Sequence, residues 1–309
     1  MPRFAIDHRS QGGRPDSSDS REVKGRGRST RKAFTKLETV PRPSISPTPQ
    51  LFSSRSLLKI SLFSIAISDM SPPTNKHVVF DVVGTCVGYD VWFDAIASQL
   101  GERFAKLGIS PRLFAFAWME AAEREYTYLS LSGRYTIFSK LQAALFYRML
   151  YQAGVDEPRQ FATDEDLKVI TEAYDNLKMR DGVPEMFAKL RAAGFTCWCL
   201  SAGDRKRVGG YFEKAGVPMP AENLMSCDSS GIGKPDPKAY EPAIKALGDG
   251  EKWFAAAHMW DVSAARTVGF KGAYTSVWEK EPCTEIFGEM DVMAETPLEM
   301  ADKIIAASS

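Results

Sequence analysis

The sequence predicts an α/β fold, in which a doubly wound parallel sheet carries an inserted block of helices. Two observations lead to this prediction. From residue 180 onward, short apolar runs alternate with segments of helical periodicity, which is the pattern of strands and helices in a parallel sheet. Residues 91–179, in contrast, show helical spacing of apolar residues and no convincing strand. We therefore predict an α/β core at 76–90 and 180–309, and a helical cap at 91–179.

The first 75 residues have a different composition. They are rich in Ser, Pro, Gly and Arg and lack a sustained periodicity, which predicts a disordered basic extension. An Arg- and Ser-rich start is typical of mitochondrial transit peptides, but acidic residues are unfavourable in them. Four are present, namely Asp7, Asp16, Asp19 and Glu22. We expect a cytoplasmic protein, with a mitochondrial location open if the extension is native. Met70 also resembles a natural start, which leaves the status of the upstream residues open.

The composition agrees with a soluble globular enzyme. The chain has 309 residues, of which 44% are hydrophobic and 25% charged, enough for one large or two modest domains. Up to Met70 there are 13 Lys and Arg against 6 Asp and Glu, and beyond it 26 against 33. The predicted enzyme is thus mildly acidic, so we expect no nucleic-acid partner. We expect no membrane partner either and leave a homodimer open. Five cysteines without framework spacing are typical of a reducing compartment.

The most informative segment of the core is HVVFDVVGTCVGYD at 77–90. Its apolar residues predict a buried parallel strand, and Asp81 follows where that strand ends. Gly84 and Thr85 then allow a turn whose amide groups point toward whatever the carboxylate faces. Ligands of open α/β sheets bind at this edge. A turn-capping role is the alternative for Asp81, because Asp and Gly are common in turns.

Three later segments also end in polar groups. They are the strand at 196–201, which ends in Ser201, the loop GKPDP at 233–237 with Lys234, and the strand at 254–258 before Asp261. Helices are expected at 91–107, 111–129, 135–153, 164–177, 184–193, 204–215, 237–247 and 262–268. Further strands are expected at 224–227 and 273–277, and a final strand and helix at 291–307.

Asp81, Ser201, Lys234 and Asp261, in this chain order, resemble the four motifs of the haloacid dehalogenase superfamily over about residues 76 to 307. The resemblance implies a Rossmannoid core with a helical cap. Within the superfamily, the chain is similar to the type II 2-haloacid dehalogenases. Phosphatases of the superfamily carry a second aspartate two residues after the first, and here that residue is Val83. The segments EYTYL at 125–129, GRY at 133–135 and the pair Trp260-Asp261 also resemble this branch.

The chemistry expected of these residues is hydrolysis through an enzyme ester. Asp81 would attack an electrophilic carbon, and Lys234 would keep it ionised. Ser201 and the amides after it would bind a substrate oxygen, while Asp261 would hold Lys234 or help to activate water. By resemblance, that water attacks the ester carbonyl of Asp81. Further substrate-binding candidates are Thr85, Ala202, His258, Trp260 and Arg124.

No cofactor is expected, and Mg²⁺ is the alternative. The best specific hypothesis is removal of halide from a small 2-haloalkanoic acid. A divergent hydrolase or phosphatase for another metabolite and a non-catalytic binding protein are the alternatives. Each site residue also has a structural alternative: Ser201 and Asp261 as helix caps, Lys234 as a solvated loop lysine, and His258 as a buried structural histidine.

The sequence departs from the type II pattern in the cap. The resemblance implies an arginine a few residues before the EYT segment, where it binds the substrate and the halide. An ungapped alignment places Glu120 there, with Met119 beside it. We expect Arg124 or Arg134 to substitute only if the cap helices are differently rotated. In the core, Ala202 replaces an asparagine, Ala256 replaces a serine and His258 replaces a second asparagine.

Overall fold

The computed structural model describes residues 75–308. The expectations for residues 1–74 lie outside this range. Among the described residues, no helix combines the length and the apolar character that are needed to cross a bilayer.

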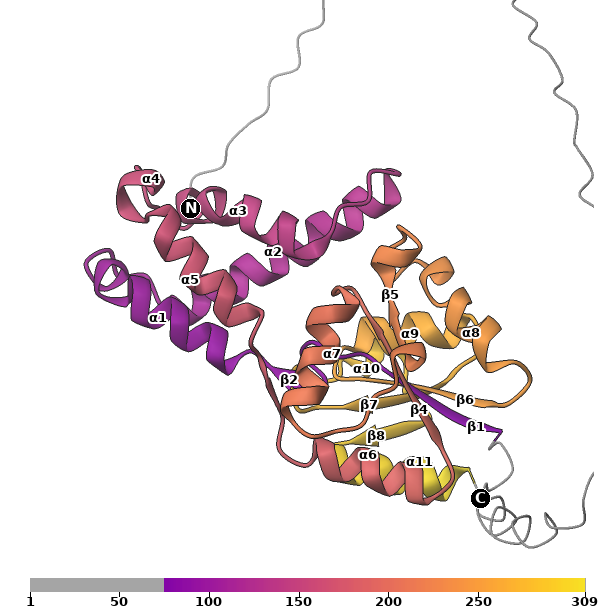
Figure 1. Ribbon diagram of the computed structural model, residues 1–309. Helices are drawn as coiled ribbons and strands as arrows, with labels where there is room; N and C mark the ends of the chain where they lie inside the picture. Colours follow the sequence, from indigo (N-terminus) through magenta and orange to yellow (C-terminus); the bar gives the residue numbers. More distant parts are fainter. Residues whose placement is uncertain (1–74, 309) are drawn as a thin grey trace, which may run out of the picture. The chain divides into compact units, whose positions relative to one another are not determined.

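A six-stranded sheet forms the core, with the strand order β5-β4-β1-β6-β7-β8 and every neighbouring pair parallel (Figure 1). Its strands are β1 (Lys76–Phe80), β4 (Thr196–Ser201), β5 (Leu224–Ser226), β6 (Glu251–Ala256), β7 (Lys271–Thr275) and β8 (Val292–Ala294). The predicted α/β fold class is confirmed. The chain adds strands first on one side of β1 and then on the other, so β1 lies where the strand order reverses. Ligands of open α/β sheets bind at such a point.

The central strand β1 is buried on both faces. Val78 and Phe80 belong to one apolar cluster, whereas Val79 belongs to a second. All three side chains are fully buried, because successive side chains of a strand point to opposite faces and helices cover both. Each such side chain contributes roughly 1.5–3 kcal/mol to stability. The uninterrupted apolar run before Asp81 therefore follows from the position of β1 in the sheet.

The helices of the core cover these two faces. The first cluster includes residues of α6 (Val183–Ala192), α7 (Arg205–Lys214) and α11 (Pro297–Ala307), and the second includes residues of α8 (Glu241–Leu247) and α9 (Met259–Thr267). A single helix was expected over 237–247, which is wrong. The chain forms a 3₁₀ turn at Pro237–Ala239 and then α8. Pro242 has no amide hydrogen to donate to an earlier carbonyl, so a continuous helix cannot form there.

One further expectation for the core needs correction, and one element of the core was not predicted. The strand expected to reach His258 ends at Ala256, and His258 is the N-cap residue of α9. A short helix, α10 (Thr284–Phe287), was not predicted.

Five helices follow β1 and precede the strand at Lys178–Met179. They are α1 (Asp90–Ala105), α2 (Pro111–Leu131), α3 (Phe138–Gln152), α4 (Pro158–Phe161) and α5 (Asp164–Tyr174). Local signals set several of these bounds. Ser110 caps α2 before Pro111, and Thr163 with Asp166 forms a capping box at α5. The helices expected at 135–153 and 164–177 are shorter than predicted, because α3 begins at Phe138 and α5 ends at Tyr174.

A two-stranded antiparallel pair, β2 (Val87–Gly88) and β3 (Lys178–Met179), joins the ends of this helical segment. It corrects the expectation that 91–179 contains helices only. Two-residue strands are too short to show an alternating pattern, so the sequence carried no signal for them.

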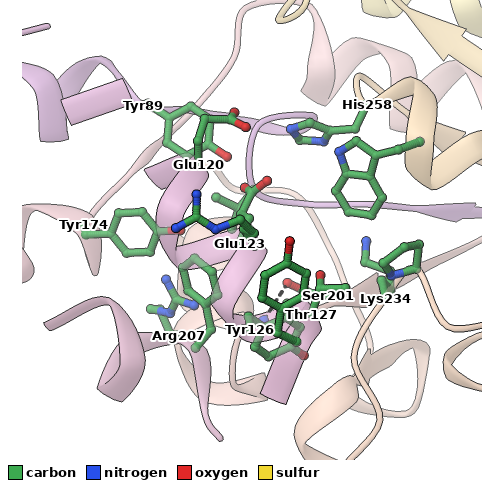
Figure 2. Close-up of a pocket in the computed structure, with 18 residues that line it drawn as sticks. Tyr89, Glu120, Glu123, Tyr126, Thr127, Tyr174, Ser201, Arg207, Lys234 and His258 are labelled. Carbon is green, nitrogen blue, oxygen red and sulfur yellow. Dashed lines mark hydrogen bonds between the residues drawn. The ribbon is translucent and has the colours of Figure 1, made fainter. Parts of the chain in front are cut away.

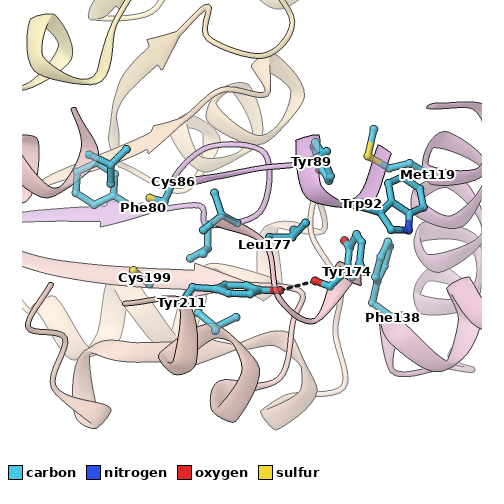
Figure 3. Packing of buried hydrophobic residues seen from close by; sticks show 14 of the residues in the cluster. Phe80, Cys86, Tyr89, Trp92, Met119, Phe138, Tyr174, Leu177, Cys199 and Tyr211 are labelled. Carbon is cyan, nitrogen blue, oxygen red and sulfur yellow. Dashed lines mark hydrogen bonds between the residues drawn. The ribbon is translucent and has the colours of Figure 1, made fainter. Parts of the chain in front are cut away.

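One apolar cluster continues from the sheet into the helical segment. Figure 3 shows it running from Phe80 and Cys199 past Leu177 to Trp92 and Phe138. A hydrogen bond from the Tyr211 hydroxyl to the carbonyl of Tyr174, 2.9 Å long, joins α7 to the end of α5. The inserted helices therefore share buried packing with the core.

Candidate active site

The site lies at the carboxyl edge of the sheet. Asp81 directly follows β1, Ser201 is the last residue of β4, and His258 lies two residues after β6. Because β4 and β6 are the two neighbours of β1, their carboxyl ends lie side by side with that of β1. The amide of Asp81 still donates to the carbonyl of Ala255 at 3.0 Å, so the ladder fixes the backbone of Asp81.

Asp81 is held as a carboxylate by two donors. Lys234 Nζ donates to its Oδ1 at 2.8 Å, and the Thr85 hydroxyl donates to its Oδ2 at 2.6 Å. Burial by itself would raise the pKa of Asp81, but the charge of Lys234, aided by His258, outweighs it and holds that pKa well below its usual range. Asp81 is therefore ionised at neutral pH. It is buried, with 6% of its surface exposed, and its partner Lys234 lines the adjacent cavity.

Lys234 is shared between two carboxylates. Besides Asp81, it donates to Asp261 Oδ2 at 2.5 Å and to the carbonyl of Leu200 at 3.4 Å. Burial would lower its pKa, but the charges of Asp261 and Asp81 raise it above the usual range. Asp261 is fully buried, and its Oδ1 accepts a hydrogen bond from the Tyr240 hydroxyl at 2.5 Å. Asp261 thus restrains Lys234 and is closed off from the solvent.

Tyr240 is a site residue that the sequence reasoning missed. It follows the 3₁₀ turn at Pro237–Ala239, and this turn directs its hydroxyl to Asp261. No sequence pattern signalled this contact, because the segment was expected to be a regular helix.

The residues present do not fit the magnesium alternative. Each of the four oxygens of Asp81 and Asp261 already accepts a hydrogen bond from a lysine or hydroxyl donor. Magnesium needs several oxygen ligands in an octahedron, whereas here the Lys234 ammonium lies between the two carboxylates. Val83, which lines the adjacent cavity, has no side-chain oxygen. Within residues 75–308, no group of three or more His, Cys, Asp or Glu is arranged to hold a metal.

A cavity of about 300 Å³ adjoins the site. Its core side includes Ser201, Ala202, Lys234, His258 and Trp260, and Figure 2 shows side chains of helix α2 facing them. The Ser201 hydroxyl accepts from the amide of Gly203 at 3.0 Å, which leaves its own proton for another acceptor. Thr85 Oγ1 accepts from the amide of Ala257 at 2.9 Å. This hydrogen bond from the Ala257 amide orients the Thr85 hydroxyl so that it donates to Asp81.

His258 lies at the boundary between the cavity and Asp81. Its Nδ1 is 3.5 Å from Asp81 Oδ2, an ion-pair distance without hydrogen-bond geometry. Burial by itself lowers the pKa of His258, but the carboxylate of Asp81 outweighs it and raises the pKa to about 9. The ring packs 5.5 Å from the indole of Trp260, and the Lys234 ammonium is 5.9 Å from that indole.

The side of the cavity that is formed by the inserted helices, above all α2, is called the cap side, and it carries carboxylates. Glu120 and Glu123, three residues apart on α2, both line it (Figure 2). Burial raises the pKa of Glu123 to about 7. Glu123 was missed in the sequence, although its spacing from Glu120 predicts one helix face for both.

The cap arginines are placed as follows. Arg124 lines the cavity with a side chain that is 53% exposed and that approaches Glu125 at 3.5 Å. Arg134 is exposed and is not among the residues that line the cavity. A core arginine that was not predicted, Arg207 of α7, lines the cavity with only 7% of its side chain exposed.

Comparisons with known proteins point to one family. The model of the haloacid dehalogenase-like hydrolases matches residues 75–269. The (S)-2-haloacid dehalogenase of Pseudomonas sp. (strain YL) is 28% identical over 199 residues, which is 63% of this chain and 80% of that protein. Haloacetate dehalogenase H-2 of Moraxella sp. (strain B) is 27% identical over 201 residues, which is 63% of this chain and 83% of that protein.

Solved structures show the same fold. The L-2-haloacid dehalogenase of Xanthobacter autotrophicus superposes with a TM-score of 0.59 at 19% identity, over 75% of this chain and 98% of that one. A second structure of that protein, with chloropropionic acid covalently bound, has a TM-score of 0.58 at 18% identity, over 74% and 98% of the two chains. The ordered motifs, the parallel sheet and the family match agree, and the chain belongs to the haloacid dehalogenase-like hydrolases.

Proposed function

We propose that this hydrolase removes halide from a small 2-haloalkanoic acid through an ester on Asp81. The observation that carries the proposal is the state of Asp81. It is an ionised carboxylate, neutralised by one lysine that a second carboxylate restrains, and it lies beside a cavity. A carboxylate in this condition is a ready nucleophile.

The reaction consists of two displacements. In the first, an Asp81 oxygen forms a bond to C2 of the substrate, the carbon–halogen bond breaks, and the halide leaves with the bonding electrons. In the second, water attacks Cγ of the Asp81 ester, and the bond breaks between Cγ and the ester oxygen, which came from Asp81 and leaves as the product hydroxyl. The products are a 2-hydroxy acid, halide and one proton, and the Asp81 carboxylate is restored.

The core residues around Asp81 support these steps. Lys234 offers its charge to the substrate and to the oxyanion formed at Cγ. Ser201 and Ala202 line the cavity, and the Ser201 hydroxyl and the backbone amides of this loop would orient the substrate carboxylate. The hydrogen bond from Thr85 orients the Asp81 carboxylate, and the indole of Trp260 gives the cavity an apolar wall. Asp261 acts through Lys234 as a positioning residue.

Val83 separates this proposal from phosphatase chemistry. An alkoxide leaving group needs a proton, which a valine cannot supply, whereas a halide leaves as a stable anion. The alternative with a specific observation behind it is hydrolysis of another metabolite, because Glu120 takes the place of the expected cap arginine and carries the wrong charge for a carboxylate. A non-catalytic binding role does not explain why a lysine and two carboxylates are buried together at the cavity, where unpaired charges are costly.

A paired assay tests the proposal. The purified protein is given both enantiomers of 2-chloropropionate and 2-bromopropionate, and separately a panel of phosphate monoesters, each with EDTA or with added Mg²⁺. We expect halide release that survives EDTA, little phosphate release in either condition, and loss of halide release in Asp81→Asn. Strong Mg²⁺-dependent phosphate release without halide release would contradict the proposal. Release of neither product would favour another metabolite.

A further inference from the structure

His258 is a buried side chain that the site leaves without hydrogen bonds. It is 5% exposed, and within the described part of the chain neither ring nitrogen has a hydrogen-bond partner. Buried polar atoms are nearly always paired, so an unpaired set calls for an explanation. Each oxygen of the nearby Asp81 and Asp261, in contrast, accepts a hydrogen bond. Because His258 lines the cavity, its missing partner can come from there.

The position of the ring is tightly fixed. A Cβ atom on Gly84 would lie 2.5 Å from Cε1 of His258, so the ring packs directly on the glycine turn. Gly84 has φ +91°, and Arg180 holds its carbonyl with hydrogen bonds of 3.1 and 3.0 Å. Trp260 packs on the same ring. The imidazole is therefore held next to Asp81, with Nδ1 3.5 Å from Oδ2.

The charged groups around His258 come from several elements, and the acidic ones dominate. They are Asp81 after β1, Glu120 and Glu123 on α2, Asp261 on α9 and Glu279 after β7. Among these, Asp81 has the largest influence on the pKa of His258. In the resting enzyme His258 therefore carries a proton. Once Asp81 is an ester it has no charge, and burial then favours the neutral ring.

We propose that His258 is the general base that activates water against the Asp81 ester. This inference rests on the proposed function. Ester formation releases the His258 proton to the solvent, and the neutral ring accepts a proton from the attacking water as its oxygen bonds to Cγ. When the bond from Cγ to the ester oxygen breaks, the ring returns that proton to the departing alkoxide. The new Asp81 carboxyl group then passes its proton to His258, which restores the resting pair.

Asp261 is less suited to this step. It is fully buried, and Lys234 and Tyr240 already occupy its two oxygens. A base must come within hydrogen-bond reach of the water that attacks Cγ. His258 adjoins both Asp81 and the cavity from which that water would come.

A single-turnover experiment with His258→Gln separates base catalysis from substrate binding. Glutamine keeps hydrogen-bonding capacity but cannot take up a proton at neutral pH. With (S)-2-chloropropionate as the probe, we expect about one equivalent of halide to appear at nearly the wild-type rate, followed by turnover that is about 10²- to 10⁴-fold slower. Intact mass should show the added propionate unit, and peptide mapping should place it on Asp81.

His77→Gln is the matched control, because His77 is the other histidine among residues 75–308 and its ring contacts Trp198 away from the cavity. It should turn over like wild type. If His258→Gln unfolds, His258→Ala is used instead, and added imidazole should restore hydrolysis of the trapped ester. In wild type, ester hydrolysis should slow as the pH falls through the pKa of His258 in the ester form, and His258→Gln should lose that dependence.

The outcomes are distinct. Unchanged turnover in His258→Gln would overturn the role of His258 and leave the nucleophile proposal intact. Loss of the halide burst in His258→Gln would also overturn the role of His258 as the base for ester hydrolysis, since it would place His258 in substrate binding or in the first displacement. Absence of halide from the wild-type protein with every 2-haloacid tested would overturn both proposals together.

Discussion

The two sides of the cavity differ in how completely their acidic groups are paired. On the core side, each oxygen of Asp81 and Asp261 accepts a hydrogen bond, and Lys234 lies between the two carboxylates. On the cap side, Glu123 is desolvated enough to raise its pKa to about 7, and Arg124 is half exposed.

This difference indicates that the two sides have different roles in the reaction. A fully paired charge cluster has one stable arrangement, so the core side is suited to hold the reacting groups in place. The cap side has groups whose charge and position can respond to a ligand, so it is suited to select substrates. Substitutions on the two sides should consequently change different kinetic parameters.

The largest effect is expected from Asp81→Asn. The amide is nearly the same size as the carboxylate but is not a nucleophile, so turnover should fall by about 10⁴-fold or more. Halide assays and a thermal melt would measure both activity and folding. In a single wild-type turnover in heavy-oxygen water, label should enter Asp81 before the product. A folded variant that stays active without deamidation would remove Asp81 from the mechanism.

Lys234→Met should have the next largest effect. It leaves two buried carboxylates without their cation, and we expect a loss of roughly 10²- to 10³-fold in kcat, comparable to the removal of one electrostatic stabiliser. Lys234 holds the pKa of Asp81 down. In Lys234→Met the pKa of Asp81 should therefore rise. As the pH is lowered, the variant should lose activity at a higher pH than wild type does.

The control is Lys238→Met, four residues later and exposed. A pH–rate profile of both variants checks the prediction. The same acid limb in Lys234→Met as in wild type would mean that Lys234 does not set the charge of Asp81.

The core side was largely predictable from the sequence. Parallel strands end at the same edge of a sheet, so motifs that follow separate strands must converge there, as Asp81 and Ser201 do. The signs of the charges also predicted which side chains would pair, since Lys234 was the cation expected to face the carboxylates of Asp81 and Asp261. Tyr240 was not predictable, because its direction depends on a 3₁₀ turn whose phase the sequence does not show.

The cap side was less predictable, for a physical reason. Which side chains of α2 face the cavity depends on the rotation of that helix, and its apolar pattern indicates the buried side without fixing the polar edge. Arg124 was expected to face the substrate only with a different rotation, and it lies at the cavity but half exposed. Arg207 was missed because it comes from the core helix α7, where no cation was sought.

Gly84→Ala tests whether the core side depends on close packing. A side chain at Gly84 meets the His258 ring and also requires a positive φ, so we expect a loss of about 1–3 kcal/mol in stability and of roughly tenfold or more in turnover. Gly108→Ala is the control, because Gly108 has φ +68° and nothing within 4 Å of the added Cβ.

Both glycine variants should lose about 2–4 °C in Tm for each kcal/mol, but only Gly84→Ala should lose activity. Equal turnover in the two variants would show that the position of His258 against the glycine turn is not needed for catalysis.

The smallest effect, and the most specific to the cap side, is expected from Glu123→Gln. Since burial raises the pKa of Glu123 to about 7, its carboxyl group becomes charged as the pH rises through 7 and should then repel an anionic substrate. In wild type, KM for 2-chloropropionate should therefore rise by about three- to tenfold between pH 6 and 8, while kcat changes little on this account. Glu123→Gln should lose most of that rise.

The control is Glu102→Gln, which removes the same charge at an exposed position on α1 and should keep the rise in KM. If Glu123→Gln keeps the full pH dependence of KM, Glu123 does not face the bound substrate. If it lowers kcat instead, the two sides of the cavity are not functionally separate, because a cap residue would then act on the reacting groups.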